Sequence, residues 1–184
     1  MLDVTRLSQE EEEFAKKLGW DGFYTLSPQP VKGRWILETE WKSLEDLKEV
    51  IRKNRKKVPI WVNGSGLKAN RMILSLSGIS FIRALKLDYV AVRLASKNGI
   101  RIVFDFNQLL LRSGSERARI WSKYWQVARL VRKYKAPFAL VTLAGSRWEL
   151  RSPSELLAFG RKLGFQDPEI KSALQIESLS SSSA

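Results

Sequence analysis

Short apolar segments alternate with amphipathic helices along this chain, and this alternation limits the possible folds more than any other feature of the sequence. Eight segments rich in Val, Ile, Leu and aromatic residues are expected to be strands: Leu2–Thr5, Gly22–Leu26, Arg34–Glu40, Val58–Val62, Met72–Leu76, Tyr89–Val92, Ile100–Phe104 and Phe138–Thr142. Several are apolar at nearly every position, as are strands covered on both faces. Their alternation with helices implies parallel pairing, in either a doubly wound sheet or a barrel.

Capping signals mark where the helices begin. A Ser followed three residues later by an acid predicts helix starts at Ser8, Ser43, Ser113 and Ser152. These helices are expected to end near Leu18, Asn54, Tyr134 and Gly164. Asp167-Pro168 predicts a short final helix, because proline is favoured at the first helical position.

The elements predict an α/β fold, a reduced TIM-like (β/α) barrel of mostly parallel strands, because eight strands need no second sheet. A full eightfold barrel takes about 250 residues, whereas this chain has 184. The segment Arg93–Gly99 is too short to hold a helix between the candidate strands on either side of it. We therefore expect one barrel domain over residues 1–175, followed by a Ser-rich disordered tail over residues 176–184.

The chain contains neither cysteine nor histidine. Disulfides, thiolate metal sites and hydrolases with a histidine base are therefore excluded, as are most catalytic zinc sites. Carboxylate-bound magnesium and carboxylate acid/base pairs remain chemically possible. Asp105, just past a predicted strand, is the one catalytic candidate, but a lone acid there is more often a turn former.

The charge predicts a polyanionic partner. Lys and Arg number 32 against 19 Asp and Glu, which gives a net charge of +13. Residues 101–162 carry 13 of the basic and 4 of the acidic residues, a local charge of 13 − 4 = +9. Nucleic acid is the favoured partner, since phosphate contacts release condensed counterions. Because the N-terminus lacks a secretion-signal pattern and no apolar run approaches about 20 residues, we expect a cytoplasmic chain without a membrane partner.

The predicted helix Gly114–Tyr134 concentrates this charge. Its aromatic stripe is expected to face the core or another subunit rather than stack on bases, and its basic stripe to contact phosphate. The first stripe comprises Trp121, Tyr124, Trp125, Ala128 and Val131, and the second comprises Arg119, Lys123, Gln126, Arg129 and Lys133.

Three further segments have two interpretations each. The basic run Arg52–Lys57 either complements the end of a helix or also touches RNA. Asn63–Gly66 follows a strand but matches no phosphate-binding motif, so a plain turn is favoured. Leu143–Arg147 follows the last strand, at the end of a barrel that often binds phosphate, or is an ordinary connection.

The region from Ile100 to Leu174 resembles the thirty-kilodalton, TIM-barrel-like protein subunit family of archaeal and eukaryotic ribonuclease P. The resemblance is carried by Leu109-Leu110, Glu116-Arg117-Ala118, Val131–Tyr134, Thr142, Ala144-Gly145, Trp148–Leu156, Gly160, Leu163 and Gly164. Its most specific part is the segment Leu150–Leu156 at its distance from Glu116-Arg117-Ala118. The half before Ile100 agrees more loosely.

The resemblance implies an RNA-binding subunit that stabilises a catalytic RNA, which removes the 5′ leader from precursor tRNA. It implies ribonuclease P RNA, precursor tRNA, a small ferredoxin-like protein subunit and other ribonuclease P proteins as partners. It also implies that magnesium is held by the RNA, that the protein binds no cofactor or metal, and that the chain itself is a non-catalytic part of an endoribonuclease, a hydrolase. Family members usually carry a further helix where Arg93–Gly99 lies, so this chain is expected to be one helix shorter.

No catalytic residue is assigned on these grounds. Arg117 and Arg151 are the first candidates for RNA contact because they lie inside the matching motifs, although Arg151 could instead pair with Glu149 or Glu155. Charge and helical phase add Arg83, Arg112, Arg119, Lys123, Arg129, Lys133 and Arg147. The alternative functions are a stand-alone carboxylate- and metal-dependent phosphoesterase or nuclease on the same barrel, and a general basic RNA-binding module.

Overall fold

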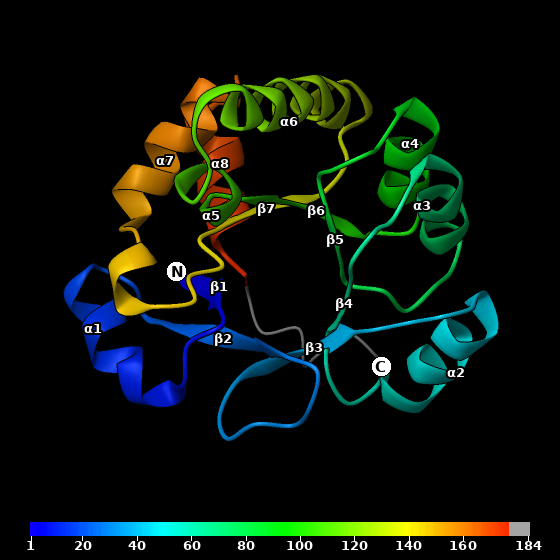
Figure 1. The fold of residues 1–184 in the computed structure, drawn as a ribbon, viewed down its shortest axis with the longest axis horizontal. Helices are drawn as coiled ribbons and strands as arrows, with labels where there is room; N and C mark the ends of the chain where they lie inside the picture. Colours follow the sequence, from blue (N-terminus) through cyan, green and yellow to red (C-terminus); the bar gives the residue numbers. More distant parts are fainter. Residues whose placement is uncertain (177–184) are drawn as a thin grey trace.

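A computed structural model gives the arrangement of the chain and describes residues 1–176. Seven parallel strands follow one another around a nearly closed barrel in sequence order, with the helices outside (Figure 1). The strands are β1 Leu2–Thr5, β2 Gly22–Ser27, β3 Trp35–Thr39, β4 Ile60–Val62, β5 Phe81–Arg83, β6 Arg101–Asp105 and β7 Phe138–Val141. The predicted TIM-like α/β barrel is confirmed, and six of the eight predicted strands overlap an observed one.

Most helices connect successive strands along the chain, α7 and α8 follow the last strand, and together they cover the outer side of the barrel. They are α1 Glu12–Lys17, α2 Leu44–Asn54, α3 Leu67–Leu74, α4 Tyr89–Lys97, α5 Asn107–Leu110, α6 Gly114–Tyr134, α7 Pro153–Lys162 and α8 Asp167–Leu174, with the 3₁₀ turns η1 Gln9–Glu11 and η2 Arg147–Glu149. Ser43 with Asp46 and Ser152 with Glu155 form the predicted capping boxes. The side chains of Ser8 and Ser113 precede their helices without making a capping hydrogen bond.

Two predicted strands are helical. Met72–Leu76 belongs mostly to α3, and Tyr89–Val92 begins α4, where the Asp88 carboxylate accepts a hydrogen bond from the Ala91 N–H at 3.0 Å. The buried residues of α4 are Ala91, Val92 and Ala95, a helical spacing that a short apolar run conceals. The strand between these helices, β5, is not predicted because only two of its three residues, Phe81 and Ile82, are apolar, whereas the equally short β4 lies within a longer apolar segment.

The structure does contain a helix where the sequence predicts that one is missing. Arg93–Gly99 is not a bare connection, because α4 extends through Lys97 and joins β5 to β6. The short connection instead joins β2 to β3, where residues 28–34 contain no helix and form the loop at the lower edge of Figure 1. The segment Arg93–Gly99 is too short for a helix only if Tyr89–Val92 is a strand, whereas those four residues form the start of α4.

The strand side chains alternate between two apolar cores. The barrel interior holds Val4, Ile36, Trp61, Phe81 and Val103, and the larger core lies between the strands and the helices. Ile176 is also buried inside the barrel, so the predicted tail does not begin at that residue. The remainder of the predicted tail, 177–184, lies outside the described residues. Within the described chain, no helix has the length and apolar character needed to cross a bilayer.

The sheet closes where β7 meets β1. Val4 O accepts a hydrogen bond from the Leu143 N–H at 2.9 Å, and the Arg6 N–H donates to Ala144 O at 2.8 Å. Because all seven strands are parallel, their carboxyl ends lie at one end of the barrel, the barrel mouth, where ligands bind in barrels of this type.

Candidate functional site

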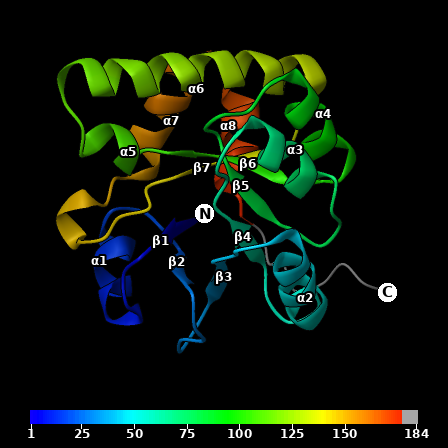
Figure 2. The ribbon, with the colours of Figure 1, turned by 45° about the vertical axis from the view of Figure 1, so that its right-hand side comes forward.

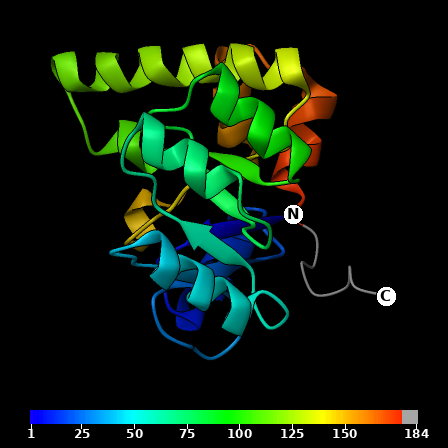
Figure 3. The same cartoon turned by 90° about the vertical axis from the view of Figure 1, so that its right-hand side faces the viewer.

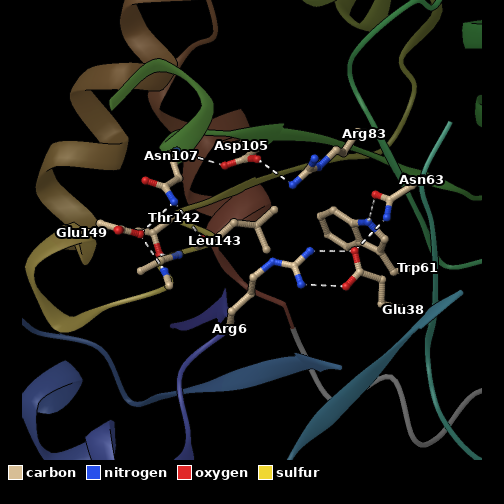
Figure 4. Close-up of polar contacts among 12 residues, drawn as sticks. Arg6, Glu38, Trp61, Asn63, Arg83, Asp105, Asn107, Thr142, Leu143 and Glu149 are labelled. Carbon is tan, nitrogen blue, oxygen red and sulfur yellow. Dashed lines mark hydrogen bonds and ion pairs between the residues drawn. The ribbon is translucent and has the colours of Figure 1, made fainter. Parts of the chain in front are cut away.

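The barrel mouth contains an arginine–carboxylate cluster contributed by β1, β3 and β4. Arg6 follows β1 and binds Glu38 of β3 through two hydrogen bonds of 2.8 and 2.7 Å (Figure 4). The Asn63 amide, just after β4, donates to the same carboxylate at 2.7 Å. Burial opposes ionisation of Glu38, but the hydrogen bonds from Arg6 and Asn63 outweigh it, so the pKa of Glu38 is lowered.

A second pair lies across the mouth. Arg83, at the end of β5, faces Asp105 of β6 with 3.1 Å between Nη2 and Oδ2. The Asp105 carboxylate also accepts the Asn107 N–H at 2.9 Å, as a turn-forming acid does. Burial raises the pKa of Asp105 to about 6, against the opposing charge of Arg83. Among the described residues, Arg83 Nε and Asn107 Oδ1 are buried without a hydrogen-bond partner.

In the loop after β7, the Glu149 carboxylate accepts a hydrogen bond from the loop's own backbone. Glu149 accepts hydrogen bonds from the Gly145 N–H at 2.7 Å and from the Asn107 amide at 2.9 Å. The hydrogen bond from Gly145 is the main reason that the pKa of Glu149 is lowered. Arg147 in the same loop binds Glu11 at 3.0 Å. In the segment Leu143–Arg147, for which phosphate binding and an ordinary connection were both open, the Gly145 N–H is therefore occupied by Glu149.

A pocket of about 320 Å³ at the mouth is lined by Arg6, Arg83, Asp105 and Glu149, among others. Each carboxylate of the mouth is held by a guanidinium or a backbone amide: Glu38 by Arg6, Asp105 by Arg83 and Glu149 by Gly145. In residues 1–176, no group of three or more acidic side chains is placed to hold a metal ion. Asp105, the one catalytic candidate from the sequence, thus lies in an ion pair and a turn.

The helix α6 presents a different surface. It runs along the outside of the barrel at the upper edge of Figures 2 and 3, on the side away from β2 and β3. We call its exposed residues from Arg119 onward the α6 outer face: Arg119, Ser122, Trp125, Gln126, Arg129, Arg132 and Lys133. The single acid of α6, Glu116, lies in the first turn, outside this face, and binds Arg112 at 3.0 Å.

Most of the cations of α6 have no carboxylate partner within residues 1–176. Arg132 is 3.6 Å from Glu169 of α8. Arg119, Lys123, Arg129 and Lys133 form no ion pair with any part of the chain that the structure describes. Tyr124, Ala128 and Val131 are buried as predicted. Trp125 departs from the predicted core stripe because it is 46% exposed, and Lys123 is half-buried.

The nine predicted RNA-contact residues fall into separate groups. Arg119, Lys123, Arg129 and Lys133 lie along α6, and Arg83 lies in the mouth. Arg112 and Arg117 are near the start of α6, where the Arg117 Nε donates to Arg112 O at 2.5 Å. Arg117 also borders an apolar groove of about 530 Å³ between α5 and α6.

Arg151, a first-rank candidate, makes several contacts within its own loop. It donates to Trp148 O at 2.9 Å and to Leu150 O at 2.8 Å, and its Nε is 3.6 Å from Glu155. Its own carbonyl accepts the Trp20 indole N–H at 2.8 Å. The sequence left open whether Arg151 contacts RNA or pairs with a nearby acid. These contacts favour the second role, with Glu155 as the acid.

Sequence reasoning missed three residues of the mouth, Arg6, Glu38 and Asn107, and favoured a plain turn for the segment that begins at Asn63. Arg6 and Asn63 come directly after predicted strands, and the rule that function gathers at the carboxyl ends of barrel strands could have found them. Glu38 and Asn107 gave no such signal. Glu38 is placed by the register of β3 against β4, and Asn107 by the turn that Asp105 forms.

The fold and the surface define a class: a parallel α/β barrel whose mouth charges are paired and whose outer helix is densely cationic. The sequence model of one protein family, described as "RNase P subunit p30", matches residues 37–180. The chain belongs to this family, which confirms the resemblance found in the sequence.

Individual relatives agree. "Ribonuclease P protein component 3" of Methanocaldococcus jannaschii is 28% identical over 185 residues, covering 86% of this chain and 80% of the relative. The protein of the same name from Thermococcus kodakarensis is 30% identical over 146 residues, covering 76% of this chain and 64% of the relative. A chain in a cryo-EM structure of archaeal ribonuclease P with mature tRNA has the same fold, with a TM-score of 0.82 and 24% identity over 94% of this chain and 86% of that one.

Proposed function

We propose that this chain is an RNA-binding protein subunit of ribonuclease P, which supports RNA-catalysed removal of the 5′ leader from precursor tRNA. The observation that carries the proposal is the α6 outer face, whose cations Arg119, Arg129 and Lys133 lack carboxylate partners among the described residues. Each phosphate that such a cation neutralises releases condensed counterions and strengthens binding. Membership of the family supplies the identity of the RNA.

The mouth supports a non-catalytic role for the chain itself. A carboxylate- and metal-dependent phosphoesterase on this barrel would use acids such as Glu38 and Asp105. Arg6 and Arg83 engage those carboxylates and oppose binding of a cation there. We therefore assign the magnesium of the reaction to the RNA and no metal or cofactor to the protein.

The partners in this proposal are ribonuclease P RNA, precursor tRNA, the small ferredoxin-like subunit and other ribonuclease P proteins. A structure with the same fold comes from an archaeal ribonuclease P bound to mature tRNA. We place the chain in the cytoplasm, where an archaeal cell makes and processes its tRNA.

Reconstitution of the enzyme tests the proposal. Precursor-tRNA cleavage by the RNA with the remaining protein subunits, at low magnesium, is expected to increase when this chain is added. The variant Arg119→Gln/Arg129→Gln/Lys133→Gln should restore less activity than the wild type. A matched control, Lys17→Gln/Lys32→Gln/Lys42→Gln, removes the same charge from exposed positions elsewhere and should behave like the wild type.

The same assay contains the result that would overturn the proposal. Cleavage of precursor tRNA by the purified chain with magnesium, without any added RNA subunit, would establish the phosphoesterase alternative. Equal activity of both triple variants would show that the α6 outer face is not the surface that supports the RNA.

A further inference from the structure

Trp125 is an unusual residue for the surface on which it lies. The residues around it that face the barrel, Tyr124, Val127 and Ala128, are at most 2% exposed, whereas Trp125 is 46% exposed. A large aromatic side chain left half in water forfeits much of the stabilisation that burial would give it. The packing of α6 on the barrel therefore does not explain why a tryptophan occupies this position.

The charges around Trp125 restrict what could cover it. The Arg129 guanidinium carbon lies 5.0 Å from the centroid of the Trp125 ring, a cation–π contact. Lys133, on the next turn, has no carboxylate partner among residues 1–176, whereas the neighbouring Arg132 lies 3.6 Å from Glu169 of α8. A partner here has to bring both a flat apolar group for the ring and negative charge for the cations. An unpaired nucleotide carries both, as a base and a phosphate.

We propose that Trp125, with Arg129, is a stacking platform for an unpaired base, so that the RNA held by α6 includes a single-stranded nucleotide. The inference rests on the proposed RNA-binding function of α6 and adds the structural class of RNA that it recognises. Every base has a π-face, so the platform selects unpaired structure rather than sequence. Arg129 contributes to the stack and neutralises a neighbouring phosphate.

Binding to defined RNAs tests the inference. The full chain is titrated with a single-stranded oligouridylate and with a duplex RNA of the same length, using Trp125→Leu, Trp125→Phe and the wild type. Trp125→Leu is expected to weaken oligouridylate binding on the order of tenfold and leave duplex binding unchanged. Trp125→Phe should recover most of the loss, because phenylalanine also stacks.

Fluorescence provides a second readout that does not depend on the fold tolerating leucine. Oligouridylate should quench part of the wild-type indole emission, and that part should be absent in Trp125→Phe, which retains the other six of the seven tryptophans. Duplex RNA should quench neither protein.

The outcomes separate this inference from the proposed function. If the triple variant of Arg119, Arg129 and Lys133 binds both RNAs like the wild type, the proposed function fails together with the platform. If that variant is weakened but Trp125→Leu is not, the platform alone is wrong. Equal losses for single-stranded and duplex RNA would also overturn it and would assign Trp125 to a protein contact or to packing.

Discussion

Asp3 and Thr142 join the two ends of the sheet. The buried Asp3 carboxylate of β1 accepts the backbone N–H of Thr142, just past β7, at 2.9 Å, and also contacts the Thr142 hydroxyl. A second backbone donor, the Val4 N–H, lies 2.8 Å from the same carboxylate oxygen. One side chain thus helps to close a barrel that has seven strands rather than eight.

This position makes stability depend on pH. Burial raises the pKa of Asp3 from 3.8 to about 7, although the hydrogen bonds from Thr142 oppose the shift. Because the folded state holds this proton more tightly than the unfolded state does, its contribution is fully present below about pH 4 and is lost as the pH rises to about 7. The pKa of Asp105 is raised to about 6, so Asp105 also makes the folded state less stable as the pH rises.

The variant Asp3→Asn should remove most of this dependence. The amide has the shape of the protonated acid, so it can donate to the Thr142 hydroxyl while still accepting both backbone N–H groups. At pH 8 the variant is expected to be more stable than the wild type, by at most ~4 kcal/mol for a shift of about three pKa units. Urea unfolding from pH 4 to 8 measures this, with the exposed Glu45→Gln as control. An unchanged decline in the Asp3→Asn protein would refute the assignment.

The contribution of the Arg6–Glu38 pair to stability should have the opposite pH dependence: it is present at neutral pH and is lost as the pH falls. Arg6→Met leaves the largely buried Glu38 carboxylate with Asn63 alone and should cost about 1–3 kcal/mol at pH 7. Since the pKa of Glu38 is lowered in the folded protein, the cost should shrink as the pH falls and the carboxylate is protonated.

A double-mutant cycle isolates this pair. Glu38→Gln combined with Arg6→Met should be less destabilised than the two single effects added together, because no uncompensated charge remains. Strict additivity at pH 7 would mean that the two side chains do not interact.

Arg151→Ala should act on stability before it acts on RNA. The side chain binds two carbonyls of its own loop, so its removal should lower the free energy of unfolding by about 1–2 kcal/mol. Thermal unfolding measured beside assembly with ribonuclease P RNA separates the two roles. Normal stability with impaired assembly would instead make Arg151 the direct RNA contact that its motif suggested.

The sequence predicted well what local signals determine. The capping boxes located α2 and α7, and the periodicity of α6 separated its buried residues from its cations. It failed where a short apolar segment fits two structures. Met72–Leu76 and Tyr89–Val92 were read as strands, although Asp88 caps α4, and the true strand Phe81–Arg83 is too short to show an alternating pattern.

The mouth was less predictable because its contacts are set by the register of distant strands. Arg6 and Glu38 are 32 residues apart and meet only when β1, β2 and β3 are aligned. The exposure of Trp125 was equally hidden. The helical phase places it at the edge of the core stripe, and only the packing of α6 on the barrel determines which edge residues stay in water.

The salt dependence of RNA binding tests the central claim most directly. The affinity of the chain for ribonuclease P RNA, measured from low to physiological salt, should fall linearly on logarithmic axes. The variant Arg119→Gln/Arg129→Gln/Lys133→Gln should lower the slope by about 2 to 3, at 0.7–0.9 per lost phosphate contact, while Lys17→Gln/Lys32→Gln/Lys42→Gln keeps it. Equal slopes for the two triple variants would contradict phosphate recognition by α6.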